Sequence, residues 1–141
     1  GLSNIRTELQ DASVCREEWK DSADVVLCDV PCSGLGIIRK KPEIRFKNPD
    51  EIRTLPEIQA RILANCAQYV KKGGTLVYST CTILQRENED VVRAFLTENP
   101  EFEAVSWTHP VCGERADGMV TLLPPVHNTD GFFIAKMHRK V

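Results

Sequence analysis

This sequence has no long apolar run and no strong excess of charge of either sign. None of its apolar stretches reaches the roughly 18 residues that a membrane-spanning helix needs. Its first ten residues lack the basic and apolar regions of a secretion signal, so we expect an intracellular, cytoplasmic protein. A formal net charge of −2 excludes a polycation that coats nucleic acid without selectivity. With 42% hydrophobic residues among 141, the chain can bury the core of one domain.

The sequence also lacks the cysteine patterns of a zinc site and of a disulfide framework. None of its six cysteines forms a C-x-x-C pair, and the three histidines lie far from Cys28 and Cys32. Disulfide frameworks are typical of small secreted domains that cannot build a sufficient core. We therefore expect free thiols and no bound metal.

A glycine-rich turn after a first strand is missing as well. Open α/β sheets that bind nucleotide-like cofactors normally begin with such a strand and turn, and no such turn precedes Asp11. The sequence contains no internal repeat, low-complexity tract or linker. We expect a single domain, or part of one, that begins partway through its architecture.

Two segments predict buried β-strands. Residues 25–31, VVLCDVP, are a short apolar run that leads into a turn, and residues 74–81, GTLVYSTC, are rich in β-branched and aromatic residues. Further strands are expected at residues 4–10, 102–107 and 131–138.

Between the two main strands the pattern predicts a helix. Apolar residues recur at helical spacing from 58 to 69, Pro56 suits the first turn, and residues 71–73 have the composition of a helix end. A strand, helix and strand of this length nearly always give two parallel neighbours joined by a right-handed crossover. We predict an α/β fold whose parallel central strands carry the ligand site at their C-terminal ends.

A second helix is expected after Cys81. Thr82 and Gln85 have the spacing of a capping box, and apolar residues between 91 and 96 make one helical face. Asn99 and Pro100 should end this helix.

Cys32 and Cys81 each directly follow a predicted strand, beside small hydroxyl residues. Three interpretations are open for them: buried apolar thiols, a redox pair, or nucleophilic catalysis. A strand-to-loop junction can expose a thiol to a cleft, where nearby N–H groups favour the thiolate. Burial in the core, the commonest fate of a cysteine, is assigned to the other four: Cys15, Cys28, Cys66 and Cys112.

A basic segment, RKKPEIRFK, occupies residues 39–47 and holds five cations, one glutamate and one aromatic residue. It could contact several RNA phosphates, or it could be a solvated loop. Its cations are Arg39, Lys40, Lys41, Arg45 and Lys47.

Five motifs carry a resemblance to a known family. They are DVPCSGLG at 29–36, RKKPEIR at 39–45, GGTLVYSTCT at 73–82, ENE at 87–89 and DGFFIAK at 130–136. In order and spacing they resemble the Nop/Sun-type RNA cytosine-5 methyltransferases, from about Asp11 to the C-terminus. The helix after the basic segment is most similar to the bacterial small-subunit ribosomal RNA branch.

The resemblance implies an enzyme with a Rossmann-like sheet that methylates RNA cytosine with S-adenosylmethionine. Cys81 resembles the nucleophile that attacks cytosine C6, and Cys32 the residue that assists product release. Asp29 resembles the acid that hydrogen-bonds the cytosine edge, and it also contacts the cofactor. Asp11 and Pro31 resemble cofactor contacts, Asp11 on the adenine side and Pro31 as a pocket wall.

The resemblance further implies that residues 1–141 are the C-terminal portion of a catalytic domain, incomplete at its N-terminal half. The family's glycine-rich cofactor loop and N-terminal RNA-binding domain are not in this sequence, so we expect weak cofactor binding by this chain alone. A second chain could cover the sheet edge left open. The basic segment would contact RNA around a single-stranded or flipped cytosine.

Two other functions are possible. A thiol hydrolase or peroxidase would need a histidine beside Cys32 or Cys81. A non-catalytic RNA-binding or assembly module would keep the fold without the chemistry.

Overall fold

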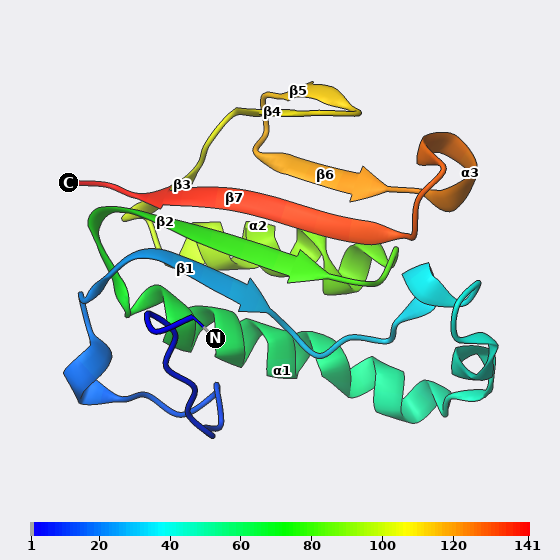
Figure 1. The fold of residues 1–141 in the computed structure, drawn as a ribbon, viewed down its shortest axis with the longest axis horizontal. Coiled ribbons are helices and arrows are strands. Elements are labelled where there is room, and N and C mark those ends of the chain that lie inside the picture. The colour runs from blue at the N-terminus through cyan, green and yellow to red at the C-terminus, as the bar shows by residue number, and fades with distance from the viewer. Residues whose placement is uncertain (1) are drawn as a thin grey trace.

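Two neighbouring strands of the sheet run parallel to each other. The computed structural model describes residues 2–141 and places β1 (Ala23–Asp29) beside β2 (Val70–Thr80), with α1 (Pro49–Ala67) as their connection. Their register runs from Val25 opposite Thr75 to Asp29 opposite Ser79. The predicted parallel pair is confirmed, and both strands end at the same edge of the sheet (Figure 1).

The remaining strands extend this sheet. Its order is β1-β2-β7-β3, and β6 also pairs with β7, which runs antiparallel to β2. The bounds of these strands are Phe102–Ala104 for β3, Met119–Leu122 for β6 and Phe132–Arg139 for β7. A separate ribbon pairs β4 (Trp107–His109) with β5 (Gly113–Arg115). The segments expected as strands at 102–107 and 131–138 therefore do contain strands, although the first divides between β3 and β4.

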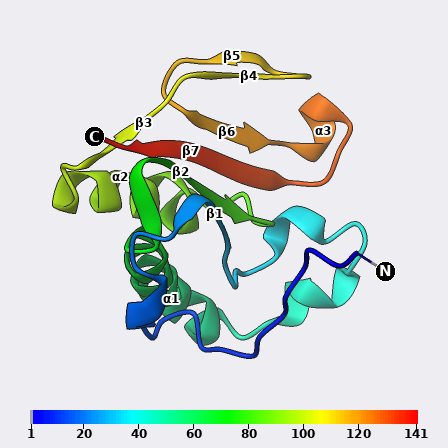
Figure 2. The same ribbon diagram turned by 60° about the vertical axis from the view of Figure 1, so that its left-hand side comes forward.

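Two helices cover one face of the sheet, α1 and α2 (Glu89–Glu98), as Figures 1 and 2 show. The shorter helices lie in the connections: η1 (Glu17–Trp19), η2 (Leu35–Ile37), η3 (Pro42–Phe46), η4 (Gln85–Glu87) and α3 (Pro124–His127). No helix in residues 2–141 has the length and apolar character to cross a membrane.

The core lies between the sheet and these helices. Leu76 and Tyr78 on β2, Leu63 on α1 and Phe133 on β7 are completely buried there. The rings of Tyr78 and Phe133 meet edge to face with centroids 6.1 Å apart, which is a favourable aromatic geometry. Val25 and Leu27 of β1 point to the opposite face of the sheet, where both side chains are exposed.

The first helix begins earlier and ends earlier than the sequence pattern predicts. The side chain of Asn48 accepts a hydrogen bond from the Asp50 N–H at 3.0 Å, and Pro49 takes the first helical position, so Pro56 lies inside the helix. The residues expected to close the helix, 71–73, belong to β2, where Gly73 has a φ of 77° and the β1 pairing shifts its register.

The second helix has its predicted apolar face but not its predicted capping box. Val91, Val92 and Phe95 are buried, and the helix ends at Glu98. It begins only at Glu89, however, and Gln85 bonds Asp90 instead of capping the helix. The capping-box prediction was wrong because a 3-10 turn, η4, occupies that stretch.

The strand expected at residues 4–10 is not formed. This segment has no regular structure, and within residues 2–141 the edge strand β1 pairs with β2 alone. A strand needs a hydrogen-bonded neighbour, and no described segment supplies one here. Coverage of the β1 edge by a second chain stays a prediction.

Leu76 and Leu27 offer a matched test of which sheet face is the core. Leu76→Ala should lower the free energy of unfolding by about 2–5 kcal/mol, because it empties a fully buried site. Leu27→Ala, on the neighbouring strand and 67% exposed, should change it by less than about 0.5 kcal/mol. Urea unfolding of the 141-residue chain measures both, and similar losses for the two variants would contradict the assigned core.

Candidate active site

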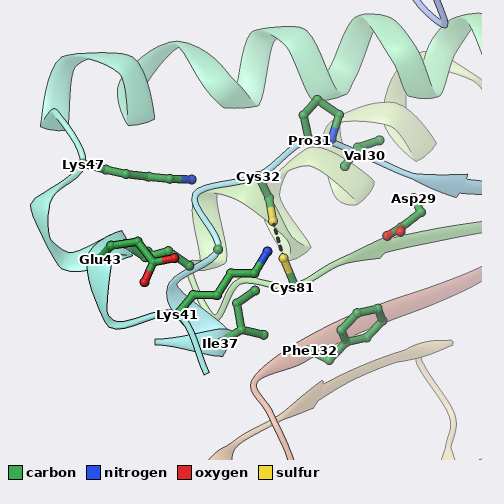
Figure 3. Close-up of a pocket in the computed structure, with 12 residues that line it drawn as sticks. Asp29, Val30, Pro31, Cys32, Ile37, Lys41, Glu43, Lys47, Cys81 and Phe132 are labelled. Atoms are coloured by element: carbon green, nitrogen blue, oxygen red, sulfur yellow. Dashed lines mark hydrogen bonds between the residues drawn. The ribbon is translucent and has the colours of Figure 1, made fainter. Parts of the chain in front are cut away.

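A cavity of about 430 Å³ opens where β1 and β2 end (Figure 3). Asp29 and Pro31 line it from the end of β1, Cys32 from the following loop and Cys81 from the end of β2. Lys41 enters from the basic segment. This is the position at which open α/β sheets bind their ligands.

The two thiols that the sequence singled out lie side by side in this cavity. The sulfur atoms of Cys32 and Cys81 are 3.2 Å apart and form a hydrogen bond. Burial, and then the contact with Cys81, raises the pKa of the Cys32 thiol to about 12. Either sulfur can be the donor in this hydrogen bond, and the raised pKa means that Cys32 keeps its proton near neutral pH. The predicted shared cleft is confirmed.

Gly36 brings three loops together around the sulfurs. Its N–H donates to the Cys81 carbonyl at 3.0 Å, and its own carbonyl accepts from the Gly131 N–H at 2.8 Å. A Cβ atom on Gly36 would lie 2.1 Å from the Gly131 carbonyl oxygen, well inside van der Waals contact. Only glycine permits this close approach. It joins the Pro-Cys loop, the loop after β1 that contains Pro31 and Cys32, to the segments that contain Cys81 and Gly131.

A buried carboxylate supports the Pro-Cys loop from below. Glu87 is fully buried, and its Oε2 accepts from the Ser33 N–H at 2.8 Å and from the Gln59 side chain at 3.0 Å. Gln59 also donates to the Pro31 carbonyl at 2.9 Å. These contacts hold the backbone on both sides of Cys32, while the second carboxyl oxygen of Glu87 and the amide oxygen of Gln59 are buried without a partner among the described residues.

The loop that follows Cys81 has its own support. The Thr80 hydroxyl donates to the Asn88 side-chain oxygen at 2.6 Å, and the Asn88 amide donates to the Thr82 carbonyl at 3.0 Å. The Thr82 and Ser33 hydroxyls bond each other at 2.7 Å and join the two loops. The sequence alone indicates no role for Glu87 or Asn88 of the ENE motif, since their partners lie in other segments.

The five cations of the basic segment take three different positions. Lys41 and Lys47 line the cavity, and Lys47 donates to the Ser33 carbonyl at 2.9 Å. The other three make contacts elsewhere. Arg39 and Lys40 approach Asp130 at 3.8 and 2.5 Å, and Arg45 stacks on the Phe46 ring with its guanidinium carbon 5.0 Å from the centroid.

Asp11 is the one predicted cofactor contact that does not line the cavity. It accepts hydrogen bonds from the Ser13 N–H and hydroxyl, which lower the pKa of its carboxyl. The next residue, Ala12, is held through its carbonyl by Asn65 near the C-terminal end of α1, whereas the cavity lies beyond the other end of that helix. A cofactor contact by Asp11 stays a prediction.

No histidine lines the cavity among the residues described, 2–141. The hydrogen-bond partner of Cys32 is another thiol, not an imidazole. The arrangement that a thiol hydrolase or peroxidase would require is therefore not the one found beside these sulfurs.

Gly36→Ala should separate the two thiols. The added methyl group must displace backbone, so a trivalent arsenical such as phenylarsine oxide should no longer bridge Cys32 and Cys81, which it should do in the unchanged chain. Peptide mapping by mass spectrometry identifies the bridged pair. Gly113→Ala is the control: its φ of 73° adds local strain in the β4–β5 turn, but a Cβ there meets nothing within 4 Å, so it should keep the bridge. Bridging that survives Gly36→Ala would contradict this packing argument.

The raised pKa of Cys32 predicts an unusual pH profile for its alkylation. An unperturbed thiol, with a pKa of 9.0, stops gaining reactivity once the pH exceeds that value, whereas Cys32 should gain roughly tenfold per pH unit up to about pH 10. Iodoacetamide labelling followed by mass spectrometry gives the rate in the folded chain and in urea. A folded-state profile that levels off near 9.0 would contradict the raised pKa of Cys32.

Known proteins share this chain's sequence and fold. The family model of the 16S rRNA methyltransferases RsmB/F matches residues 1–138. The probable ribosomal RNA small subunit methyltransferase B of Bacillus subtilis is 44% identical over an alignment of 147 residues. The alignment covers 99% of this chain and 33% of the relative. Ribosomal RNA small subunit methyltransferase B of Thermus thermophilus is 40% identical, covering 84% of this chain and 30% of the relative.

A solved structure agrees with these relatives. NSun6 from Pyrococcus horikoshii, crystallised with the S-adenosylmethionine analogue SFG, superimposes with a TM-score of 0.68 at 27% identity, over 80% of this chain and 29% of that one. The chain spans about a third of the length of the curated relatives it matches. Because the family model extends over residues 1–138, the chain belongs to the RsmB/F (Nop/Sun) family of S-adenosylmethionine-dependent rRNA methyltransferases, which have a Rossmann-like fold.

Proposed function

We propose that this chain supplies the thiol half of an RNA cytosine-5 methyltransferase site, with Cys81 as nucleophile and Cys32 as its proton-bearing partner. The observation that carries the proposal is the pair of sulfurs 3.2 Å apart in a cavity at the ends of two parallel strands. The family relationship supports RNA as the substrate.

The chemistry of cytosine explains why a nucleophile is needed. C5 is a weak nucleophile until a thiolate adds to C6, because that addition moves the electron pair of the C5–C6 double bond onto C5. In the proposal the Cys81 sulfur forms this bond. Asp29, at the wall of the same cavity, hydrogen-bonds the edge of the base and favours the addition.

The cavity wall suits part of an S-adenosylmethionine site. Asp29 receives a hydrogen bond from the Ser79 hydroxyl at one carboxylate oxygen, 2.8 Å away, and no described residue bonds the other oxygen. A carboxylate with a free oxygen can bind the ammonium group of the cofactor, and Pro31 supplies an apolar wall beside it. When bound, S-adenosylmethionine supplies an electrophilic methyl group. Asp29 and Pro31 would hold it, with Asp11 as a further predicted contact.

Cys32 acts on the sulfur of Cys81 at both ends of the reaction. Its S–H, donated to that sulfur, stabilises the thiolate before attack and again when the C6–S bond breaks. After methylation a water molecule takes the C5 proton, the electron pair of the C5–H bond re-forms the C5–C6 double bond, and the C6–S bond breaks so that Cys81 leaves as a thiolate. Hydrogen bonds to charged groups are worth about 1.5–3 kcal/mol, so loss of this one should slow release substantially.

The basic residues on the rim can hold the RNA. Lys41 and Lys47 line the cavity, and Arg45 with Phe46 forms an exposed cation and aromatic pair on the same segment. Cytosine must be single-stranded or flipped out of a helix before a thiol at the base of such a cavity can reach C6. Phosphate contacts from the rim would keep the strand in place meanwhile.

Replacing each cysteine tests this division of labour in the full-length protein. Cys81→Ser should abolish methylation and any covalent protein–RNA species, because a hydroxyl has far less anionic character than a thiol near neutral pH. In the Cys32→Ala variant the Cys81 sulfur should still add to the base but leave it slowly, so a denaturant-resistant RNA adduct should accumulate. A denaturing gel with substrate RNA and cofactor reports both results.

Cys112→Ser is the matched control, since Cys112 lies outside the cavity. It should methylate RNA without accumulating an adduct. An adduct that persists in Cys81→Ser and disappears in Cys32→Ala would reverse the two roles. RNA binding with neither adduct nor methylation in the unchanged protein would favour a non-catalytic module.

A further inference from the structure

A second cavity, of about 310 Å³, lies between the β4–β5 turn and α3. His109 and His127 line it together with apolar side chains, among them Val111 and Leu122. Its volume is at the lower end of the roughly 300–1,000 Å³ typical of ligand sites. Figure 1 shows α3 and the β4–β5 turn at the same end of the sheet as the ends of β1 and β2.

The backbone orients both imidazole rings in the same way. Nδ1 of His109 accepts from the N–H groups of Val111 and Cys112, each at 3.2 Å, and Nδ1 of His127 accepts from the Leu123 N–H at 2.9 Å. A neutral ring whose Nδ1 accepts carries its proton on Nε2. Within residues 2–141 neither Nε2 has a hydrogen-bond partner, so two residues that line the cavity each have an imidazole N–H left to donate.

Four consecutive residues connect this cavity to the first. Thr129 lines the second cavity, Asp130 pairs with Lys40, Gly131 bonds Gly36, and Phe132 lines the cavity with the two thiols. Three peptide units separate Thr129 from Phe132, so their Cα atoms are at most about 11 Å apart. When the target base of an RNA strand enters the first cavity, the neighbouring nucleotides of that RNA are within reach of the second cavity.

We propose that the second cavity binds an unstacked nucleotide of the same RNA strand, close to the target cytosine. Imidazole faces and the apolar wall suit stacking with a base, and the two Nε2–H donors suit acceptor atoms on the base or on its phosphate. The cations between the cavities, Arg39 and Lys40, lie along the path of that strand. This inference rests on the proposed function, because it takes RNA as the ligand of the first cavity.

The test uses asparagine, which separates the two jobs of each histidine. The Asn side-chain oxygen can replace Nδ1 as the acceptor for the turn, but the residue is too short to present a donor where Nε2–H lies. The double variant His109→Asn and His127→Asn in the full-length protein should therefore bind RNA about tenfold more weakly while unfolding at nearly the same temperature. The probe is a fluorescently labelled oligouridylate with one central cytosine, followed by anisotropy.

Abasic substitutions along that RNA distinguish a base from a phosphate as the ligand. If a base is bound, one abasic position near the cytosine should weaken binding to the unchanged protein and have little effect on the double variant. If only phosphate is bound, the double variant should still bind more weakly, with no such sensitive position. Unchanged affinity in the double variant, with its fold intact, would overturn the inference.

The adduct at Cys81 separates this inference from the proposed function. When Cys32→Ala is added to the double variant, the adduct should still accumulate at saturating RNA, since Cys81 is untouched. Adduct formation together with unchanged affinity would refute only the second nucleotide site. Absence of the adduct from Cys32→Ala with both histidines in place would refute the proposed function.

Discussion

Gly36 touches the backbone of two other segments, and the geometry of the thiol pair depends on that contact. Its N–H and carbonyl bond Cys81 and Gly131, whereas a side chain at this position would overlap the Gly131 carbonyl. Each of these segments ends or begins a strand of the same sheet. Because of this close approach, the alignment of β1, β2 and β7 sets the distance between Cys32 and Cys81.

Buried polar groups then give this arrangement its rigidity. Glu87 and Asn88 are adjacent in sequence and both completely buried, yet one supports the loop of Cys32 and the other the loop of Cys81. Such groups stabilise a structure only when they are paired, and breaking one contact leaves its partner unsatisfied. The two sulfurs are held by the same short segment and so keep their relative position.

The cavity combines a protonated thiol with two cations. Burial keeps the proton on Cys32, and Lys41 and Lys47 line the same cavity. Asp130 neutralises part of the neighbouring positive charge by pairing with Lys40. The first cavity thus has a protonated thiol and lysine side chains suited to binding phosphate. The short segment from Thr129 to Phe132 leads from this cavity toward the two histidines.

Local pattern determined the central strands, the approximate helices and the two candidate cysteines. Apolar runs that end in small residues are sufficient to predict β1 and β2, and five motifs in order were sufficient to indicate the family. Helix boundaries were predicted less well. Two prolines could each begin α1, and the choice of Pro49 depended on the Asn48 cap. Residues 71–73 lie within β2, in the stretch where its pairing with β1 shifts register between Val70 and Thr75.

Only the tertiary structure decided which residues meet. The 3.2 Å contact of Cys32 with Cys81, the support from Gln59 and Glu87, and the pairing of Lys40 with Asp130 all join segments far apart in the chain. No periodicity in a sequence encodes such contacts, because they arise from the parallel alignment of strands and from the close approach at Gly36. The same reason explains why Asp11 could be predicted as a cofactor contact from its motif and yet lies outside the cavity in this chain.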